Sequence, residues 1–199
     1  MFAYIKGKVV SRNLDSLVIE NQGIGYKIQS APGLMERFPS RGEEAVVHTY
    51  LYVREDIHAL FGFPSVEELN MFELLLTVSG IGPKVASTIV GTMSPSQFAL
   101  AVITGDIKTI TQIRGIGRKG AERLVLELKD KLKGADFSDS AVSGGSVEIS
   151  GSPRQSEAIN ALVVLGYTGS EAVRAVSAVF DPERGLEDLI RLALRQLLR

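Results

Sequence analysis

The sequence predicts an α+β protein made of three small domains: an N-terminal β-barrel, a central helical domain and a C-terminal bundle of three helices. Three observations support this fold class. The first 63 residues alternate between short apolar strands and turns, residues 74–132 carry one helical pattern twice, and a Ser/Gly-rich stretch precedes a final leucine-dense segment. The expected boundaries are 1–64 for the barrel, 65–134 for the helical domain, 135–151 for a flexible linker and 152–199 for the bundle.

Five strands are expected in the N-terminal segment, because runs of alternating apolar and polar residues are separated there by turn residues. They lie at residues 4–10, 16–20, 25–29, 45–53 and 58–63, with a short helical or turn segment at 32–38. Five strands in so short a segment fit a barrel of the OB type, a fold that often binds nucleic acids. A barrel used only for assembly fits equally well, because the segment has no row of aromatic residues for base stacking.

The central domain contains the pattern Gly-Ile-Gly-x-Lys twice, at residues 80–84 and 115–119. Aligning the two copies also pairs apolar residues on either side of them: Leu75 with Ile110, Val78 with Ile113, Ile89 with Leu124 and Val90 with Val125. Self-similarity of this kind indicates a duplicated structural unit, here two helices joined by a tight hairpin. Capping boxes at Ser65 and Ser94 open two of five short helices, and the fourth is expected at 107–113.

The residue types of the hairpin suit a phosphate-binding site. The first glycine allows a positive φ, and the second opens a helix whose first N–H groups have no intrahelical partner. Free N–H groups at the positive end of a helix dipole attract an anion, and a lysine beside them adds charge, so the hairpin can hold a DNA backbone without recognising bases. The candidate DNA-binding residues are Gly80, Gly82, Lys84, Gly115, Gly117, Arg118, Lys119 and Arg123.

The glycines allow two other interpretations. A single Gly-x-Gly after a helix is more often a C-cap and turn, but here the pattern is duplicated and the lysine occurs in both copies. Residues 115–120 also match the dinucleotide fingerprint G-x-G-x-x-G, which should lie between two strands. The surrounding residues are helical and lead into the linker, so we reject a dinucleotide site. The sequence contains no Walker A motif, so we expect no nucleotide hydrolysis by this chain.

Composition limits the remaining possibilities. The 199 residues include no cysteine, which excludes disulfides and thiolate metal sites and favours the cytoplasm. The two histidines, His48 and His58, are too few to form a metal centre, and no apolar segment is long enough for a signal peptide or a membrane span. The net charge is −1, but residues 65–134 hold nine Lys/Arg against seven Asp/Glu, a local net charge of +2. One subunit should therefore bind DNA weakly, and several together more tightly.

The C-terminal segment is expected to form a separate bundle. A capping box at Ser152 opens its first helix, Gly166 and Tyr167 end that helix, Thr168 and Glu171 cap the second, and a leucine-dense third helix follows. A bundle this small is marginally stable alone, and its leucines exceed the needs of one small core. The excess suggests a surface for a partner, although all of the leucines could also be core.

The whole chain resembles the RuvA family, the Holliday-junction-binding subunits of the bacterial RuvAB branch-migration complex. The resemblance rests on the order of the domains and on five segments: both glycine hairpins, Leu124–Lys129, the turn Val53–Asp56, and Leu165–Tyr167. Composition and spacing alone indicate only a DNA-backbone binder with a mobile third domain.

The resemblance implies a homotetramer on a four-way DNA junction, with the hairpins on the minor-groove side of each arm and one or two tetramers per junction. Glu55 and Asp56 match the acidic pin of the family at the tetramer centre. Residues 152–199 would dock the ATP-driven motor RuvB, and the RuvC resolvase is a further partner that the resemblance allows. The implied role is non-catalytic, without cofactor or metal, in recombination, DNA repair and the SOS response to DNA damage.

Two functions of other classes remain open at the sequence level. Helix-hairpin-helix motifs also occur in DNA glycosylases with a lysine nucleophile and an aspartate, a spacing that Lys119 and Asp136 loosely imitate. Asp136 lies at the edge of the linker, which is a poor position for the rigid geometry that catalysis needs. A non-specific structural DNA-binding protein is the second alternative, and it would show no preference for junctions over duplex.

Overall fold

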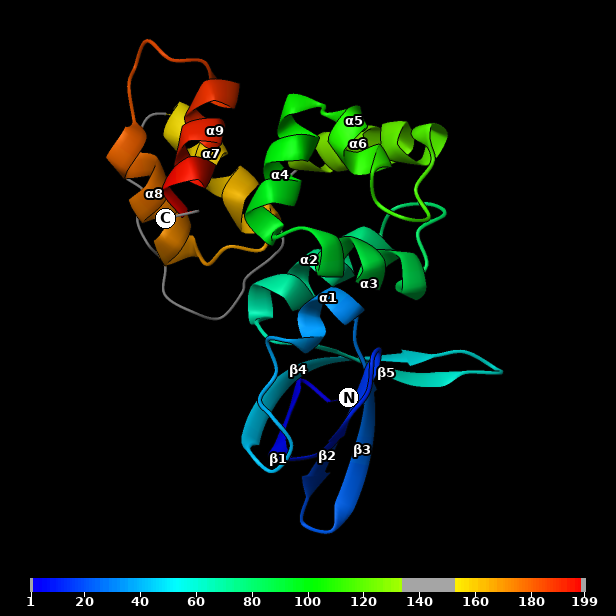
Figure 1. Cartoon of the computed structure of the whole chain (residues 1–199). Coiled ribbons are helices and arrows are strands. Elements are labelled where there is room, and N and C mark those ends of the chain that lie inside the picture. The colour runs from blue at the N-terminus through cyan, green and yellow to red at the C-terminus, as the bar shows by residue number, and fades with distance from the viewer. Residues whose placement is uncertain (1, 134–152, 198–199) are drawn as a thin grey trace. The chain divides into compact units, whose positions relative to one another are not determined.

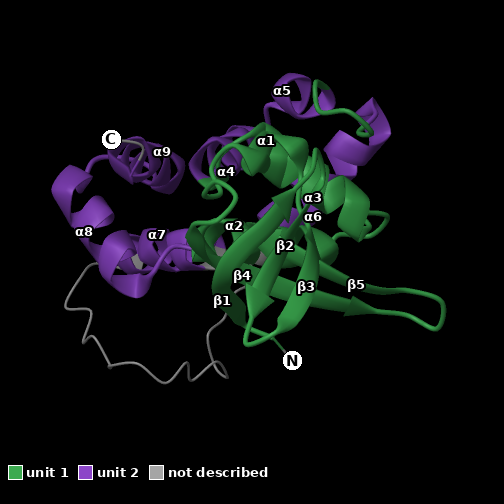
Figure 2. Cartoon of the chain, turned by 60° about the horizontal axis from the view of Figure 1, so that its bottom comes forward, with its two compact units in different colours: residues 1–95, 112–116 green, residues 96–111, 117–199 purple. Residues whose placement is uncertain are grey.

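The protein is described here from a computed structural model, which covers residues 2–133 and 153–197. The predicted linker 135–151 and the predicted cap at Ser152 lie outside the described residues. The chain forms two compact units, one of residues 1–95 with 112–116 and one of residues 96–111 with 117–199 (Figure 2). The second hairpin therefore contributes residues to both units.

The N-terminal segment forms a closed barrel of five strands in the order β1-β2-β3-β5-β4, as the sequence predicts (Figure 1). All neighbouring strands pair antiparallel except β3 and β5, which are parallel and close the barrel. The strands are β1 (Tyr4–Arg12), β2 (Ser16–Asn21), β3 (Ile24–Gln29), β4 (Glu44–Val53) and β5 (His58–Phe63).

Alternation along the strands fills the barrel. Ile5 and Val9 of β1 point inward, whereas Lys6 and Lys8 between them are exposed. Five further apolar side chains are completely buried, and each contributes about 1.5–3 kcal/mol through the hydrophobic effect. These are Leu17, Ile19, Ile28, Val47 and Phe63.

Three helices join the barrel in the first unit: α1 (Pro32–Met35), α2 (Val66–Leu76) and α3 (Pro83–Thr92). The capping box that opens α2 is confirmed, because the Glu68 N–H donates to Ser65 Oγ at 3.3 Å and the Ser65 N–H donates to the Glu68 carboxylate at 3.1 Å. Phe72 of α2 lies 4.8 Å from the Phe63 ring and 5.4 Å from the Phe61 ring, centroid to centroid. The barrel and α2 therefore share one apolar core.

The second unit contains the remaining helices. They are α4 (Pro95–Thr104, of which Pro95 belongs to the first unit), α5 (Ile107–Thr111), α6 (Arg118–Lys133), α7 (Pro153–Val164), α8 (Gly169–Val179) and α9 (Leu186–Leu197). The hydroxyl groups of Ser96 in α4 and Tyr167 after α7 form a buried hydrogen bond. Among the described helices no single one is long and apolar enough to cross a membrane; α3 and α4 together have that length and composition but are bent by 100° at their junction.

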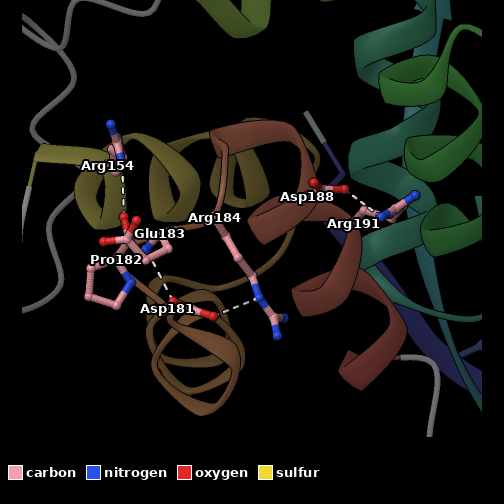
Figure 3. A network of polar contacts seen from close by, with 7 residues as sticks. All are labelled: Arg154, Asp181, Pro182, Glu183, Arg184, Asp188 and Arg191. Atoms are coloured by element: carbon pink, nitrogen blue, oxygen red, sulfur yellow. Dashed lines mark hydrogen bonds and ion pairs between the residues drawn. The ribbon is translucent and has the colours of Figure 1, made fainter.

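The C-terminal helices α7, α8 and α9 form the predicted three-helix bundle. The capping box of Thr168 and Glu171 opens α8, and Gly166, at a φ of 100°, ends the turn after α7. Ile159, Leu162 and Leu165 are all buried on one face, as expected. Polar contacts hold the α8–α9 loop: Arg154 donates to the Pro182 carbonyl at 2.9 Å, and Arg184 to Asp181 at 3.0 Å (Figure 3).

Candidate nucleic-acid interface

The first glycine hairpin joins α2 to α3 through a tight turn. Gly80 has a φ of 83°, which confirms the left-handed conformation expected there. The Ile81 N–H donates to the Val78 carbonyl at 3.1 Å, and the Ala86 N–H donates to the Gly82 carbonyl at 2.9 Å. Gly82 is the N-cap of α3 and provides no side-chain acceptor, and Pro83 at the first helical position has no N–H. The N–H groups that follow Pro83 in the first turn therefore have neither an intrahelical partner nor a side-chain cap.

The second hairpin repeats this geometry between α5 and α6. Gly115 has a φ of 94°, the Ile116 N–H donates to the Ile113 carbonyl at 3.1 Å, and the Ala121 N–H donates to the Gly117 carbonyl at 3.0 Å. All eight apolar residues that the alignment of the two copies pairs are at most 7% exposed. The duplication in the sequence is therefore a duplication in structure.

The hairpin glycines leave open space on the outer surface. A Cβ atom built on Gly82, Gly115 or Gly117 would have no heavy atom within 4 Å. Gly82 also has an ordinary φ of −93°, so neither packing nor backbone conformation requires glycine at that position. The missing side chain leaves room for another backbone to approach the N–H groups closely, as a bound phosphate requires.

Exposed cationic side chains lie at both hairpins. Lys84 and Lys119 are exposed at equivalent positions, and Arg123 is exposed one turn further along α6. Arg118 is also exposed but forms an ion pair with Glu122 at 2.9 Å. An exposed pair of this kind is worth little, about 0–1 kcal/mol, so a phosphate can compete for the guanidinium.

Arg114 is a candidate that the sequence reasoning missed. Its side chain is exposed and directly precedes Gly115 in the second hairpin, at the position that Ser79 occupies in the first. The signal was present in the sequence as a cation beside the turn glycine. The two hairpins are therefore equal in backbone geometry but differ in charge, with more positive side chains at the second.

The predicted acidic residues lie at the β4–β5 turn, which extends away from the body of the barrel (Figure 1). Glu55 and Asp56 are exposed, and none of the ion pairs among the described residues involves them. The neighbouring Arg54 turns back instead, and its Nε donates to the Tyr52 hydroxyl at 2.9 Å, which raises the pKa of the guanidinium. Neither carboxylate therefore has an ion-pair partner among the described residues, and the exposed side chain of Ile57 follows them in the turn.

The remaining candidate residues belong neither to the two hairpins nor to the acidic turn. His48 is half-buried on β4, and His58 is exposed at the start of β5. Asp136, the aspartate of the glycosylase alternative, lies outside the described residues.

Three family models match successive parts of the chain: the RuvA N-terminal domain at residues 1–62, the SAM-like helix-hairpin-helix tandem at 72–130, and the RuvA C-terminal domain at 153–198. A relative from Acetivibrio thermocellus is 48% identical, with both chains covered completely. The chain belongs to the RuvA family. Relatives from Ruminiclostridium cellulolyticum and Clostridium beijerinckii are 45% and 41% identical; each is covered completely, and they match 99% and 100% of this chain.

All three relatives bear the name Holliday junction branch migration complex subunit RuvA. The expected fold class is confirmed, because the closed five-stranded barrel, the helix-hairpin-helix tandem and the C-terminal helices coincide with the three matched segments. The family resemblance inferred from the sequence is confirmed with it.

Proposed function

We propose that this RuvA-family protein binds four-way DNA junctions and recruits a RuvB-type ATPase to them for branch migration in recombination and DNA repair. The observation that carries this proposal is the pair of glycine hairpins with matching φ angles, matching hydrogen bonds and a lysine at the same place in each. The name of the relatives supports the proposal, since each is named as a subunit of a Holliday junction branch migration complex.

Each hairpin binds DNA through its backbone phosphates. The free N–H groups at the start of α3 and α6 donate hydrogen bonds to phosphate oxygens, and the positive ends of the helix dipoles favour the negative charge. Lys84 and Lys119 add a charge beside each phosphate. Because these contacts involve no base edge, the protein binds junctions of any sequence.

The working unit is a homotetramer. A junction has four arms, and a single helical domain has a net charge of only +2 over residues 65–134. Closed fourfold symmetry brings eight hairpins to one junction, and their joint binding is far stronger than that of one subunit. Sedimentation of a stable monomer in the presence of junction DNA would contradict this arrangement.

The acidic turn gives the tetramer its preference for junctions. Glu55 and Asp56 of four subunits would place eight negative charges around one axis, where they repel a duplex that lies across the centre. A junction can open around this axis, so it suffers less repulsion. The absence of an ion-pair partner for either residue among the described residues leaves their charge available for this role.

The C-terminal bundle, residues 152–199, recruits the motor. The ATPase belongs to that partner, and this chain acts in the cytoplasm as a non-catalytic subunit. A variant that ends at residue 134 should bind junctions as the full chain does but fail to stimulate branch migration by RuvB. Full migration with the truncated variant would show that the motor docks elsewhere.

Binding of a four-way junction and of duplex DNA of equal length, measured by gel shift at several salt concentrations, tests the proposal. We expect the junction to be bound more tightly at every salt concentration, with affinity for both ligands falling steeply as salt rises. Equal affinity for junction and duplex would contradict junction recognition and would favour a non-specific structural DNA-binding protein.

A further inference from the structure

The helix α1 touches α3 through two glycines with almost no space between the backbones. A Cβ atom built on Gly33 would lie 2.0 Å from the Gly91 carbonyl oxygen, and one built on Gly91 would lie 2.4 Å from the Ala31 Cβ. Both distances are below the 3.0 Å that real Cβ contacts respect. Neither glycine has a positive φ, so the contact itself, and not the backbone conformation, requires glycine at these positions.

A second contact ties the same segment to α2. Arg37, two residues after α1, forms an ion pair with Glu68 in the first turn of α2. The Glu68 side chain is only 3% exposed and also accepts the N–H of Ser65, so it is held on two sides. The Arg37 side chain is 53% exposed, so the cost of breaking the pair falls on Glu68: removing Arg37 would leave the buried carboxylate without its charge partner. Both helices of the first hairpin are therefore fixed to residues 31–37.

Residues 31–37 connect two strands of the barrel. They lie between β3 and β4, the strand that leads directly into the acidic turn (Figure 1). The first hairpin lies at the other end of α3 from Gly91, about 10 Å away at Lys84 and about 13 Å away at Gly82 for a rise of 1.5 Å per residue. Any shift of α3 at Gly91 is therefore carried along a rigid helix to Gly82 and Lys84.

We propose that residues 31–37, through the Gly33–Gly91 contact and the Arg37–Glu68 ion pair, position the first hairpin relative to the barrel and its acidic turn. The proposal rests on the proposed function, because positioning matters only if hairpin and turn meet the same DNA. A bound junction must fit the hairpins and the acidic turn of every subunit at the same time, whereas a duplex can bind to the hairpins alone. Misplacing the hairpin should therefore weaken junction binding more than duplex binding.

The variant Gly91→Ala tests the contact directly. Its methyl group would need to move about 1–1.5 Å away from the Ala31 Cβ to reach an ordinary carbon–carbon separation of about 3.5–4.0 Å. We expect junction affinity of the full chain, measured by fluorescence anisotropy, to fall by about tenfold, which corresponds to about 1.4 kcal/mol. Duplex affinity should change much less, so the ratio of the two affinities falls.

The double variant Ala31→Gly with Gly91→Ala provides a matched rescue. Without the Ala31 Cβ, the nearest atoms to the new methyl are the Ala31 Cα at 3.7 Å and the Gly33 N at 3.8 Å, which are ordinary contacts. The junction-to-duplex ratio should therefore return to that of the wild type. If the double variant keeps the low ratio of Gly91→Ala, the effect does not arise from this contact and the proposal is wrong.

Gly62→Ala controls for general loss of stability. A Cβ there would lie 2.3 Å from Ile28 Cγ2 and 2.6 Å from Val47 Cγ1, so it strains the barrel core without touching α1 or α3. Melting temperatures are measured for every variant. We expect Gly62→Ala to lower the melting temperature while the junction-to-duplex ratio stays near that of the wild type. An equal fall of the ratio in Gly62→Ala and Gly91→Ala would overturn the proposal.

Glu68→Gln keeps the proposal testable if Gly91→Ala does not fold. It weakens the tie to Arg37 but retains an acceptor for the Ser65 N–H, and we expect a smaller, still junction-selective loss. No loss of selectivity in Glu68→Gln would count against the proposal. If the wild-type protein binds junction and duplex equally, the proposed function is wrong. If the wild type prefers junctions and the junction-to-duplex ratio is unchanged in both Gly91→Ala and Glu68→Gln, only the positioning role is wrong.

Discussion

Adding one methyl group to a hairpin glycine should have different consequences at its two positions. Gly80 and Gly115 have φ values of 83° and 94°, where alanine costs about 1–2 kcal/mol per residue. The double variant Gly80→Ala with Gly115→Ala should therefore lose about 2–4 kcal/mol of unfolding free energy. A loss of each 1 kcal/mol should lower the melting temperature by about 2–4 °C for a protein of this size.

The second glycine of each hairpin should respond in the opposite way. At Gly82 and Gly117 the Cβ would meet no heavy atom within 4 Å, and the φ of Gly82 is ordinary, so alanine should leave the melting temperature almost unchanged. The methyl would instead occupy the space that a phosphate needs. Loss of one charge-assisted hydrogen bond costs about 1.5–3 kcal/mol, so junction affinity should fall by about tenfold or more for Gly82→Ala with Gly117→Ala.

The assay combines chemical denaturation with junction binding by anisotropy for both double variants. The expected pattern is a loss of unfolding free energy for the Gly80/Gly115 variant, and a loss of junction affinity without a loss of stability for the Gly82/Gly117 variant. If the double variant Gly82→Ala with Gly117→Ala binds junctions as tightly as the wild type, phosphate does not bind at these helix ends.

Three further substitutions test the hairpin lysines, the acidic turn and the cap of α8. Replacing both hairpin lysines by alanine should weaken binding to all sequences alike, and each lost phosphate contact should reduce the slope of log K against log salt by about 0.9; an unchanged slope would place them outside the interface. The double variant Glu55→Gln with Asp56→Asn should raise the affinity for duplex more than the affinity for junction in competition gel shifts. Equal gains for both ligands would show that the acidic turn has no role in the preference for junctions. Thr168→Ala removes the side-chain cap of α8 and should lower the unfolding free energy, measured by chemical denaturation, by about 1 kcal/mol. An unchanged unfolding free energy would contradict this role of the cap. Hydrogen bonds from the Thr168 hydroxyl and N–H lower the pKa of the Glu171 carboxyl below its ordinary value of 4.5. The part of the stability that comes from these bonds to the ionised carboxylate should be present above about pH 4.5 and be lost as pH falls through the lower folded-state pKa, which NMR titration of the carboxyl would detect.

Local patterns in the sequence were sufficient to predict the barrel strands and the two hairpins. Alternation of apolar and polar residues located all five strands to within two residues at their ends, since one face of each strand is buried. The positive φ at Gly80 and Gly115 was predictable because a hairpin this tight between two helices has few other solutions. The capping boxes at Ser65 and Thr168 were also predictable, because their partners lie three residues away.

Contacts between segments far apart in the sequence could not be predicted. The close approach of Gly33 to Gly91 and the ion pair of Arg37 with Glu68 depend on how α1 lies against α2 and α3, which no local pattern encodes. The fourth central helix ends at Thr111 and not at the expected Ile113, because the chain already turns into the hairpin and the Ile113 carbonyl accepts the Ile116 N–H. Arg114 was overlooked for a different reason: the first hairpin has serine at the equivalent position, so comparison of the two copies gave it no weight.

The most direct test of the central claim is an experimental structure of the protein bound to a four-way junction. The account predicts phosphate oxygens within about 3 Å of the backbone N–H nitrogens at the start of both α3 and α6, with Lys84 and Lys119 beside them. A complex in which the DNA lies against another surface, or in which only one of the two hairpins touches a phosphate, would contradict the claim that the duplicated hairpin is the DNA-binding device.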